Sequence, residues 1–301
     1  MVPFVRVTII GLGLIGSSIA RAIRANMPSV RITGYDGDVD VRGRARSLEF
    51  CDDVTDTAGT SVIDADLILL CVPVGAMGAV ASEFANDLPS DCVVSDVGSC
   101  KQSVFDALNA ALPKAIIIPA HPVAGTEKSG PDAGFATLFK GRWCILTPPE
   151  TAPAAAVEQL SEFWRRLGAD VEIMGAAHHD RVLAITSHLP HLIAYTIVGT
   201  ADDLQEVTQS EVIKYSAGGF RDFTRIAASD PVMWRDVFLS NKDAVLEMLQ
   251  RFSEDLAALQ RAIRYDKGDE LEALFTRTRD IRRSIVEQGQ DDDMPDFGRK
   301  H

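Results

Sequence analysis

The sequence predicts an α/β domain with a doubly wound parallel sheet, followed by an all-α C-terminal domain. Short apolar, β-branched runs alternate with helical patterns from Val5 to about residue 175. A glycine-rich turn follows the first of these runs, and after His178 the patterns are helical only. Near-continuous apolar strands separated by helices are typical of a parallel sheet that helices cover on both faces.

The expected strands are seven apolar runs, which cover residues 5–10, 30–35, 66–72, 92–97, 115–120, 143–148 and 170–174. Amphipathic segments such as 75–88 and 102–112 lie between them and predict helices. In the second half, helices are expected over about 177–200, 203–215, 221–227, 231–263 and 267–288, with the fourth of them broken. These patterns divide the chain into an α/β domain (1–175), a helical domain (176–288) and a disordered tail (289–301).

The composition is that of a soluble globular protein of two domains, with 301 residues of which 46% are hydrophobic and 24% charged. No apolar run approaches the roughly 18 residues needed to cross a bilayer, and the N-terminus lacks the pattern of a signal peptide. Five widely spaced cysteines without a C-x-x-C pair favour reduced thiols. We therefore expect a cytoplasmic protein that makes no use of a membrane.

Charge and hydrophobicity narrow the expected partners. The formal net charge of −13 argues against nucleic acid, because phosphate binding needs clustered Lys and Arg. An acidic protein can still bind an anionic substrate where a few local cations invert the field. The stretch 182–200 is more apolar than a surface helix needs, so we expect it to be buried, with the interface of a homodimer as one place for it.

The turn 11–16 has the sequence G-L-G-L-I-G, which fits the G-x-G-x-x-G pattern of a Rossmann-type, dinucleotide-binding βαβ unit. A strand precedes it, a helix begins at Leu14, and a second strand ends at Asp36, 20 residues past Gly16. The first glycine permits the tight turn, the second lets a pyrophosphate approach the backbone at the helix N-terminus, and the third lets helix and strand pack closely. The expected cofactor-binding residues of this unit are Gly11, Gly13, Leu14, Ile15, Gly16 and Asp36.

Asp36 indicates NAD as the cofactor and makes NADP less favoured. A carboxylate at this place accepts hydrogen bonds from ribose hydroxyls and repels a 2′-phosphate. Arginines follow at 42, 44 and 46, and one of them folding back would weaken the preference. Val72 and Pro73, after the third expected strand, would line the cofactor, although a proline that merely ends a strand fits equally well.

Two polar loops follow later strands and mark the expected reaction site. One is D-V-G-S-C-K (96–101), and the other is H-P-V-A-G-T-E-K-S-G (121–130). The carboxyl ends of parallel strands face the ligand crevice, where the imidazole of His121 can take a proton near neutral pH. Taken alone, His121 also fits a structural histidine at a strand end, and Ser99 fits the N-cap of the following helix.

Long motifs in this chain occur in the order found in prephenate/arogenate (cyclohexadienyl) dehydrogenases, the TyrA family, which the chain resembles over essentially its whole length. They are the two polar loops, S-H-L-P-H (187–191), G-G-F-R-D-F-T-R-I-A (218–227) and S-D-P-V-M-W-R-D (229–236). The resemblance implies an NAD-dependent enzyme of tyrosine biosynthesis. Such an enzyme decarboxylates prephenate, arogenate or both oxidatively, giving 4-hydroxyphenylpyruvate or tyrosine.

The same resemblance assigns roles to single residues. His121 matches the family's catalytic histidine, and Ser99 matches the serine that orients its imidazole by a hydrogen bond. Arg225 matches a carboxylate-binding arginine, which Asp222 can steady at i,i+3, although without the resemblance an exposed salt bridge is the simpler interpretation. The other expected substrate-binding residues are His191, Thr126, Glu127 and Gly218.

The other histidines receive no catalytic role. His188 shares a helix face with His191, with Pro190 interrupting between them, and fits a core histidine. No Cys, Asp or Glu cluster completes a metal site around this pair, so no metal is expected. His178 and His179 fall at the expected domain junction.

Two other functions stay open at this level. A β-hydroxyacid-type dehydrogenase shares the two-domain plan and relies on a lysine in the helical domain, for which Lys214 and Lys242 are candidates. A non-catalytic NAD-sensing regulator would bind the cofactor without turnover. The joint presence of a proton acceptor and a carboxylate-binding arginine favours the cyclohexadienyl dehydrogenase over the regulator. Its substrate preference stays open, because Asp132 fits both a partner for the ammonium of arogenate and a plain loop carboxylate.

Overall fold

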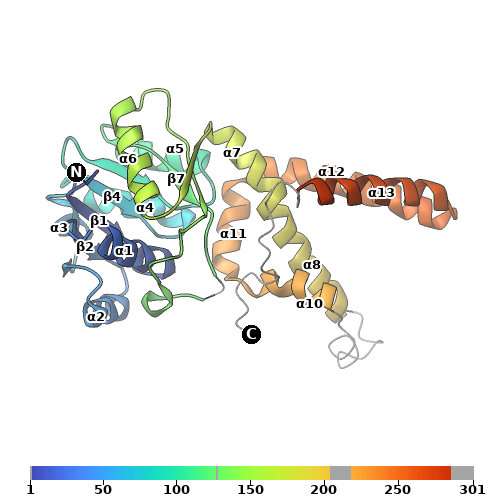
Figure 1. The fold of residues 1–301 in the computed structure, drawn as a ribbon, viewed down its shortest axis with the longest axis horizontal. Helices are drawn as coiled ribbons and strands as arrows, with labels where there is room; N and C mark the ends of the chain where they lie inside the picture. Colours follow the sequence, from blue (N-terminus) through green and yellow to red (C-terminus); the bar gives the residue numbers. More distant parts are fainter. Residues whose placement is uncertain (1, 127, 204–217, 286–301) are drawn as a thin grey trace. The chain divides into compact units, whose positions relative to one another are not determined.

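The computed structural model describes residues 2–126, 128–203 and 218–285 (Figure 1). By its internal contacts the chain forms two compact units, residues 1–245 and 246–301, and each is described by itself. The first unit carries a six-stranded sheet, a three-stranded sheet and the helices that pack on them. The expected helix over 203–215 and the expected tail lie outside the described residues, apart from residue 203.

The six-stranded sheet is entirely parallel and has the order β3-β2-β1-β4-β5-β6. Its strands are β1 (Arg6–Ile10), β2 (Arg31–Tyr35), β3 (Asp53–Val54), β4 (Leu67–Leu70), β5 (Val93–Asp96) and β6 (Ile116–Ile117). The strands β2 and β3 follow on one side of β1, and β4, β5 and β6 follow on its other side, so the topological switch point lies between β1 and β4. Ligands bind outside the carboxyl ends of the strands at such a point. The predicted doubly wound parallel sheet is confirmed.

Helices cover both faces of this sheet because its strands are apolar on both sides. Leu67 and Leu69 belong to one buried cluster, whereas Ile68 and Leu70 belong to the other, as the two-residue period of a strand requires. The first cluster includes side chains of α1 (Leu14–Asn26), α2 (Val39–Leu48) and α6 (Ala154–Arg166). The second includes side chains of α3 (Ala58–Val62), α4 (Met77–Phe84) and α5 (Gln102–Ala111).

The sequence predicts that the last three apolar runs extend this sheet, but most of their residues form a separate sheet. A second sheet joins β7 (Ala120–Pro122), β8 (Trp143–Leu146) and β9 (Asp170–Ile173), with β7 antiparallel and β9 parallel to β8. The expected strand 115–120 is divided between the two sheets. Pro119 stands at the division, where it has no amide to donate to a ladder and only its carbonyl accepts, from Thr147 N at 2.9 Å.

The helical part of the first unit begins with one long helix of three segments, α7 (Ala176–Leu183), the π-helical turn η3 (Ala184–His188) and α8 (Leu189–Asp203). Pro190 has no amide hydrogen to donate, but it does not break this helix, because the wider π turn just before it changes the hydrogen-bond pattern at this place. Then follow α10 (Gly218–Thr224), the 3₁₀ turn η4 (Arg225–Ala228) and α11 (Pro231–Ser240). Asp230 caps α11 by accepting from the amides of Val232 and Met233.

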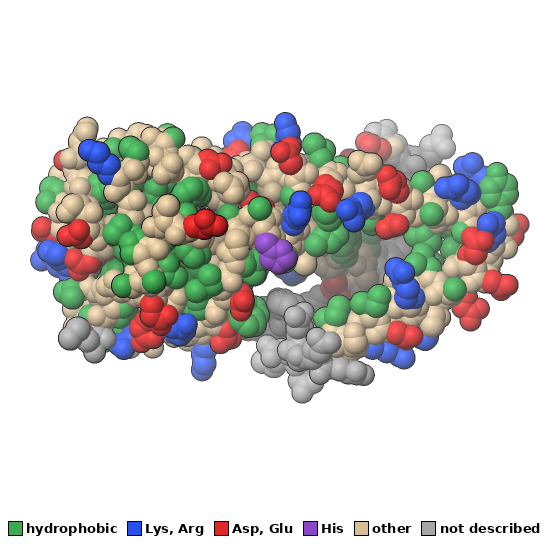
Figure 2. All heavy atoms as spheres, turned by 90° about the horizontal axis from the view of Figure 1, so that it is seen from above, with side chains coloured by type: hydrophobic (Ala, Val, Ile, Leu, Met, Phe, Trp, Pro, Cys, Tyr) green, Lys and Arg blue, Asp and Glu red, His purple; other side chains and the backbone are tan. Residues whose placement is uncertain are grey.

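The expected break in the helix 231–263 lies at Asn241, where α11 ends and α12 (Lys242–Arg264) begins. Most of α12 and all of α13 (Gly268–Ile285) form the second unit. Several of their apolar side chains are more than half exposed, among them Leu246, Ile263 and Phe275. Acidic and basic side chains are interspersed over the face of the molecule that Figure 2 shows.

One expectation about membranes needs correction. The continuous helix Ala176–Asp203 has 28 residues and is long and apolar enough to cross a bilayer by length and composition. Its few polar residues interrupt the apolar run without making the helix polar as a whole. Only 28% of the most apolar part of this helix is buried within the one chain described, so the chain by itself does not bury 182–200, and its burial in the interface of a homodimer stays a prediction. Its first turns carry the buried polar residues His179, Asp180 and His188, whose hydrogen-bond partners are His121, Lys101 and Asn241 in the site described next.

Candidate active site

Two glycines in the turn between β1 and α1 are required, because any side chain there would clash with the backbone. Gly11 has φ +97°, and a Cβ there would lie 2.4 Å from the carbonyl oxygen of Cys71. A Cβ on Gly16 would lie 1.9 Å from the carbonyl oxygen of Gly11, so helix and strand can approach this closely only with glycine. A Cβ on Gly13, in contrast, would meet nothing within 4 Å. The turn therefore leaves open space above its second glycine.

That open space suits a dinucleotide pyrophosphate. α1 begins directly after Gly13 without a side-chain cap, so its first amides, including those of Leu14 and Ile15, stay available to an anion at the positive end of the helix. At the end of β2, the Asp36 carboxylate accepts one hydrogen bond per oxygen, from Leu12 N at 2.8 Å and Asp38 N at 3.0 Å. Each oxygen keeps a lone pair for a ribose hydroxyl. The residues present fit a dinucleotide.

The three downstream arginines are each held by a protein group. Arg42 donates from Nη1 to the carbonyl oxygen of Asp36 at 2.7 Å, so it does fold back, but onto the backbone. Arg46 bonds to the end of β3 through its Nη2, at 2.8 Å from the carbonyl oxygen of Val54. Arg44 reaches across to Asp132, whose two carboxylate oxygens each lie 3.0 Å from its Nε. Asp132 is thus already paired, which weakens its interpretation as a partner for a substrate ammonium.

Val72 lies beside the glycine turn, since its Cγ1 would be 3.0 Å from a Cβ on Gly11. Pro73 is the N-cap of the short turn η1 (Val74–Ala76), where its fixed φ suits the start of a helical turn. Trp234 and Val237 of α11 form a small buried cluster with Cys100, against which Val74 packs. The helical segment therefore lies against the loops at the carboxyl ends of β4 and β5.

The D-V-G-S-C-K loop contains a fully buried ion pair. The side chains of Lys101 and Asp96 are both 0% exposed and are in direct contact through Nζ and Oδ2. Lys101 Nζ also donates to the carbonyl oxygen of Ala120 at 2.6 Å, and Asp96 accepts from Gly98 N at 2.7 Å. Burial raises the pKa of the Asp96 carboxyl, whereas the Lys101 ammonium opposes this. The pair ties the loop to the strand residue that precedes His121.

His121 itself lies in β7 and is 7% exposed. Its Nδ1 is 2.8 Å from Nε2 of His179, and no described residue forms a hydrogen bond with its Nε2. Burial lowers the pKa of His121 well below its usual value, and the neighbouring His179 and Lys101 lower it further. The site therefore holds a neutral imidazole with one nitrogen bonded and the other available.

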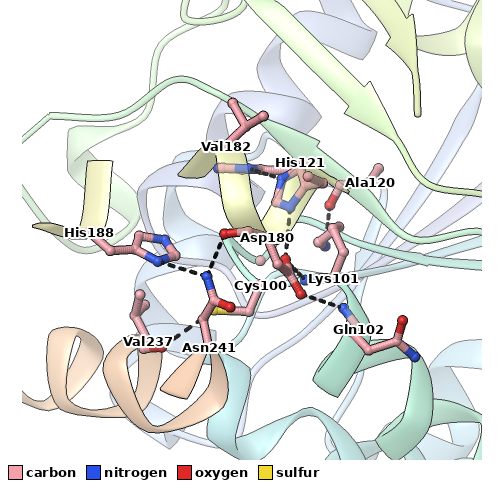
Figure 3. A network of polar contacts seen from close by, with 12 residues as sticks. Cys100, Lys101, Gln102, Ala120, His121, Asp180, Val182, His188, Val237 and Asn241 are labelled. Carbon is pink, nitrogen blue, oxygen red and sulfur yellow. Dashed lines mark hydrogen bonds and ion pairs between the residues drawn. The ribbon is translucent and has the colours of Figure 1, made fainter. Parts of the chain in front are cut away.

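His179 was given no role from the sequence, yet it is fully buried and joins two parts of the site. Figure 3 labels other members of this network, among them His121, Asp180 and Asn241. Its Nδ1 lies 2.9 Å from Oδ1 of Asp180, and Asp180 accepts from the amides of Lys101 and Gln102 at the start of α5. Asn241 adds a bond from Nδ2 to the backbone oxygen of Asp180 at 2.8 Å and one to His188 Nδ1 at 3.1 Å. The spacing along the helix could have predicted the burial of His179, because Leu183, four residues on, shares its helix face and is also buried.

Ser99 does not form the hydrogen bond with His121 that the resemblance implies, since His179 is the partner of His121 Nδ1. Ser99 is not the N-cap of α5 either, because that position belongs to Lys101. A role for Ser99 beside a bound substrate stays a prediction.

The substrate-binding residues expected in the helical segment lie partly together. His191 donates from Nδ1 to the carbonyl oxygen of Ser187 at 2.8 Å, and its ring stacks on Trp234 with centroids 3.6 Å apart. Burial lowers the pKa of His191, the Ser187 carbonyl opposes this, and the positive charge of Arg225 lowers it further. The turn η4, which begins at Arg225, packs on α8, which carries His191, and among the described residues Arg225 forms no ion pair. The structure thus brings an uncommitted guanidinium and a half-buried imidazole to one place.

The remaining expected residues are less informative. Thr126 is exposed and accepts a bond from Lys128 N at 3.2 Å. Glu127 lies outside the described residues, as does Lys214. Gly218 begins α10, and a Cβ there would lie 3.8 Å from Oδ2 of Asp222. The roles predicted for these residues stay predictions.

Comparison with known proteins gives one consistent picture. Residues 19–173 match the family model of the prephenate dehydrogenase nucleotide-binding domain, and residues 175–277 match that of the prephenate dehydrogenase dimerization domain. The cyclohexadienyl dehydrogenase of Zymomonas mobilis is 47% identical over 95% of this chain and 97% of its own length. The prephenate dehydrogenase of Bacillus subtilis is 34% identical over 90% of this chain and 74% of its own length.

A solved structure agrees with these relatives. Prephenate dehydrogenase from A. aeolicus, in complex with hydroxyphenyl propionate and NAD+, superposes with a TM-score of 0.87. It is 33% identical, and the match covers 93% of this chain and 98% of that one.

Proposed function

Because the chain belongs to the prephenate dehydrogenase family, we propose that it catalyses the NAD-dependent oxidative decarboxylation of prephenate, arogenate or both, in tyrosine biosynthesis. The observation that supports this most is the state of His121. It is a buried, neutral imidazole whose Nε2 has no partner among the described residues, while its Nδ1 is bonded to His179. A base that must accept the proton of a substrate hydroxyl needs this arrangement.

In the proposed reaction, NAD held by the glycine turn and Asp36 would supply the hydride acceptor, and the substrate would lose hydride from the ring carbon that bears the hydroxyl and lose the opposite ring carboxylate as CO2. His121 Nε2 takes the hydroxyl proton, which lets the developing alkoxide expel the hydride. Burial keeps the imidazole neutral before substrate binds and so keeps it ready as a base. Ser99 is proposed to contact the same hydroxyl region once the substrate is in place.

The substrate carries a ring carboxylate and a side-chain carboxylate, which an acidic protein must hold with few cations. We assign Arg225 to one of these carboxylates, since a guanidinium can bind a carboxylate through two parallel hydrogen bonds. His191 lies near it with its Nδ1 engaged by Ser187, which leaves Nε2 to face the ligand. Thr126, Glu127, Asp222 and Gly218 complete the proposed substrate site.

NAD is the proposed cofactor, bound by Gly11, Gly13, Leu14, Ile15, Gly16, Asp36, Val72 and Pro73. Asp36 carries the preference over NADP, because its carboxylate, which keeps lone pairs for ribose hydroxyls, would repel a 2′-phosphate. Asp36→Asn is expected to raise KM for NAD by about tenfold and to narrow the preference for NAD over NADP, since charge-assisted hydrogen bonds are lost. Steady-state kinetics with both cofactors measures this; an unchanged NAD/NADP ratio would remove Asp36 from the assignment.

Substrate range is measured by steady-state formation of NADH with prephenate, arogenate and a simple β-hydroxyacid. We expect turnover of at least one cyclohexadienyl acid and none of the hydroxyacid. The likeness to a cyclohexadienyl dehydrogenase supports turnover of both. NAD binding without any turnover would instead favour the regulator, and turnover of the hydroxyacid alone would favour the other dehydrogenase class.

We further propose a cytoplasmic homodimer with the domain limits 1–175 and 176–288. The match of residues 175–277 to a dimerization domain supports the dimer. So do the apolar side chains that one chain leaves exposed on α8, where Ile197 and Val198 are each 40% exposed. All five cysteines are free, which suits a reducing compartment. Light scattering at low micromolar concentration is expected to give twice the mass of one chain.

A further inference from the structure

We infer that His179 and Asp180 are positioning residues that fix the tautomer of His121, holding the proton on Nδ1 and leaving the lone pair of Nε2 to accept the substrate proton. This inference deepens the proposed function and rests on it for the role of His121. It follows from a chain of three groups, in which each hydrogen bond determines the direction of the next. Figure 3 labels the two ends of this chain, His121 and Asp180.

The chain begins at Asp180, which is fixed as a hydrogen-bond acceptor. Its Oδ1 accepts from Lys101 N at 2.8 Å and its Oδ2 from Gln102 N at 3.0 Å, so the carboxylate sits on the first amides of α5. The positive end of a helix stabilises a negative charge at this place. Burial alone would raise the pKa of Asp180, but the hydrogen bonds from His179, Gln102 and Lys101 hold it below its usual value. Asp180 is therefore ionised and cannot donate.

The direction of the other two bonds follows. Because the Asp180 carboxylate only accepts, His179 Nδ1, at 2.9 Å from Oδ1, carries a proton. His179 is fully buried, and burial lowers its pKa, so its ring is neutral and its Nε2 holds a lone pair. His121 Nδ1, at 2.8 Å from that lone pair, must then donate. A neutral His121 with its proton on Nδ1 has its lone pair on Nε2, the nitrogen that no described residue engages.

A purely structural role for the same residues is the competing explanation. Asp180 holds the start of α5 to α7, and His179 helps to orient its carboxylate. The two explanations attach importance to different nitrogens of His179. The tautomer depends on Nε2, which accepts from His121, whereas anchoring of Asp180 depends on Nδ1, which donates to it.

A matched pair of variants separates these nitrogens. The amide of a glutamine reaches the place of the imidazole Nε2, whereas the shorter asparagine reaches only the place of Nδ1. His179→Gln keeps an acceptor for His121, and His179→Asn keeps the donor to Asp180. We expect His179→Gln to retain kcat within about tenfold of the unaltered chain and His179→Asn to lose about 10²-fold, in the range by which a general base contributes.

The direct readout is the ¹⁵N chemical shifts of the His121 imidazole, with NAD affinity and the melting temperature measured for each protein. In the unaltered chain and in His179→Gln, Nδ1 should be protonated and Nε2 unprotonated, and in His179→Asn the two forms should mix. A protonated Nε2 in the unaltered chain would overturn the inference, as would equal kcat in the two variants. If the unaltered chain fails to oxidise either cyclohexadienyl acid, the proposed function is wrong, but the ¹⁵N shifts still decide the tautomer.

Discussion

Replacing Lys101 by methionine is expected to destabilise the protein severely at neutral pH. The ammonium has no exposed surface and contacts Asp96 and the carbonyl oxygen of Ala120. Methionine has a similar volume but no charge, so the substitution removes these bonds with little change in packing. What remains is a carboxylate with no exposed surface and with two amide donors, Gly98 N at 2.7 Å and Ala120 N at 3.3 Å.

The magnitude follows from the group left behind. A buried charge that loses its partner costs about 3–5 kcal/mol. If Asp96→Asn is combined with Lys101→Met, no charge is left, and the remaining loss is mainly the bond to Ala120, or about 1–2 kcal/mol. The double variant is therefore expected to be more stable than Lys101→Met alone. Lys114→Met, at an exposed lysine, should change the free energy of unfolding by less than about 0.5 kcal/mol.

The pH dependence supplies a second check. Burial raises the pKa of Asp96 above its value in the unfolded chain, and the ammonium that opposes this is gone in Lys101→Met. A carboxyl group with a raised folded pKa contributes stability at low pH and loses it as pH rises through the folded pKa. The difference in stability between this variant and the unaltered chain should therefore shrink as the pH is lowered from 7 towards about 4.

Urea unfolding followed by circular dichroism measures all of these quantities. The expected order of stability is unaltered chain, Lys114→Met, the double variant, then Lys101→Met. A cost below about 1 kcal/mol for Lys101→Met, or a double variant no more stable than the single one, would refute the account of a desolvated ion pair.

Three further outcomes are expected. His121→Asn should lower kcat by about 10²–10⁴-fold with NAD affinity nearly unchanged, and activity within a few-fold of the unaltered chain would end its assignment as the base. Arg225→Ala should mainly raise KM for the dicarboxylate substrate, because it removes an interaction already present in the ground state; an unaltered KM would remove Arg225 from the site. Burial lowers the pKa of His188 to about 4, so the unfolded chain takes up a proton first as pH falls. His188 by itself should contribute about 3 kcal/mol to the decline in stability from about pH 6.5 to pH 4, and His188→Gln should reduce the total decline by about that amount in urea titrations at the two pH values.

The parts of the fold that the sequence predicts well are those whose signals are local. The strands of the main sheet are apolar runs, and the glycine turn combines a steric requirement at Gly11 and Gly16 with the acidic residue at the end of β2. The separate three-stranded sheet was not predicted. Its strands are also apolar runs, and only the pairing of residues far apart in the chain assigns them to another sheet.

The site shows the same division. His121 and Arg225 could be named because their motifs are contiguous in the sequence. Lys101 and His179 could not be named from the sequence. A lysine before a helix is usually exposed to water, and nothing in the sequence around His179 indicates which residue it contacts. Both are fully buried by contacts between residues far apart in the chain: Lys101 donates from Nζ to the carbonyl oxygen of Ala120, and His179 contacts His121.

The proposed reaction is tested most directly by the stoichiometry of its two products. Prephenate labelled in its ring carboxylate is mixed with NAD and the protein, and NADH and labelled CO2 are measured over the same time course. The geometry around His121 predicts equal amounts of the two at every time point, and neither product at a comparable rate with His121→Asn. NADH formed without CO2, CO2 formed without NADH, or no reaction with prephenate and arogenate alike would contradict it.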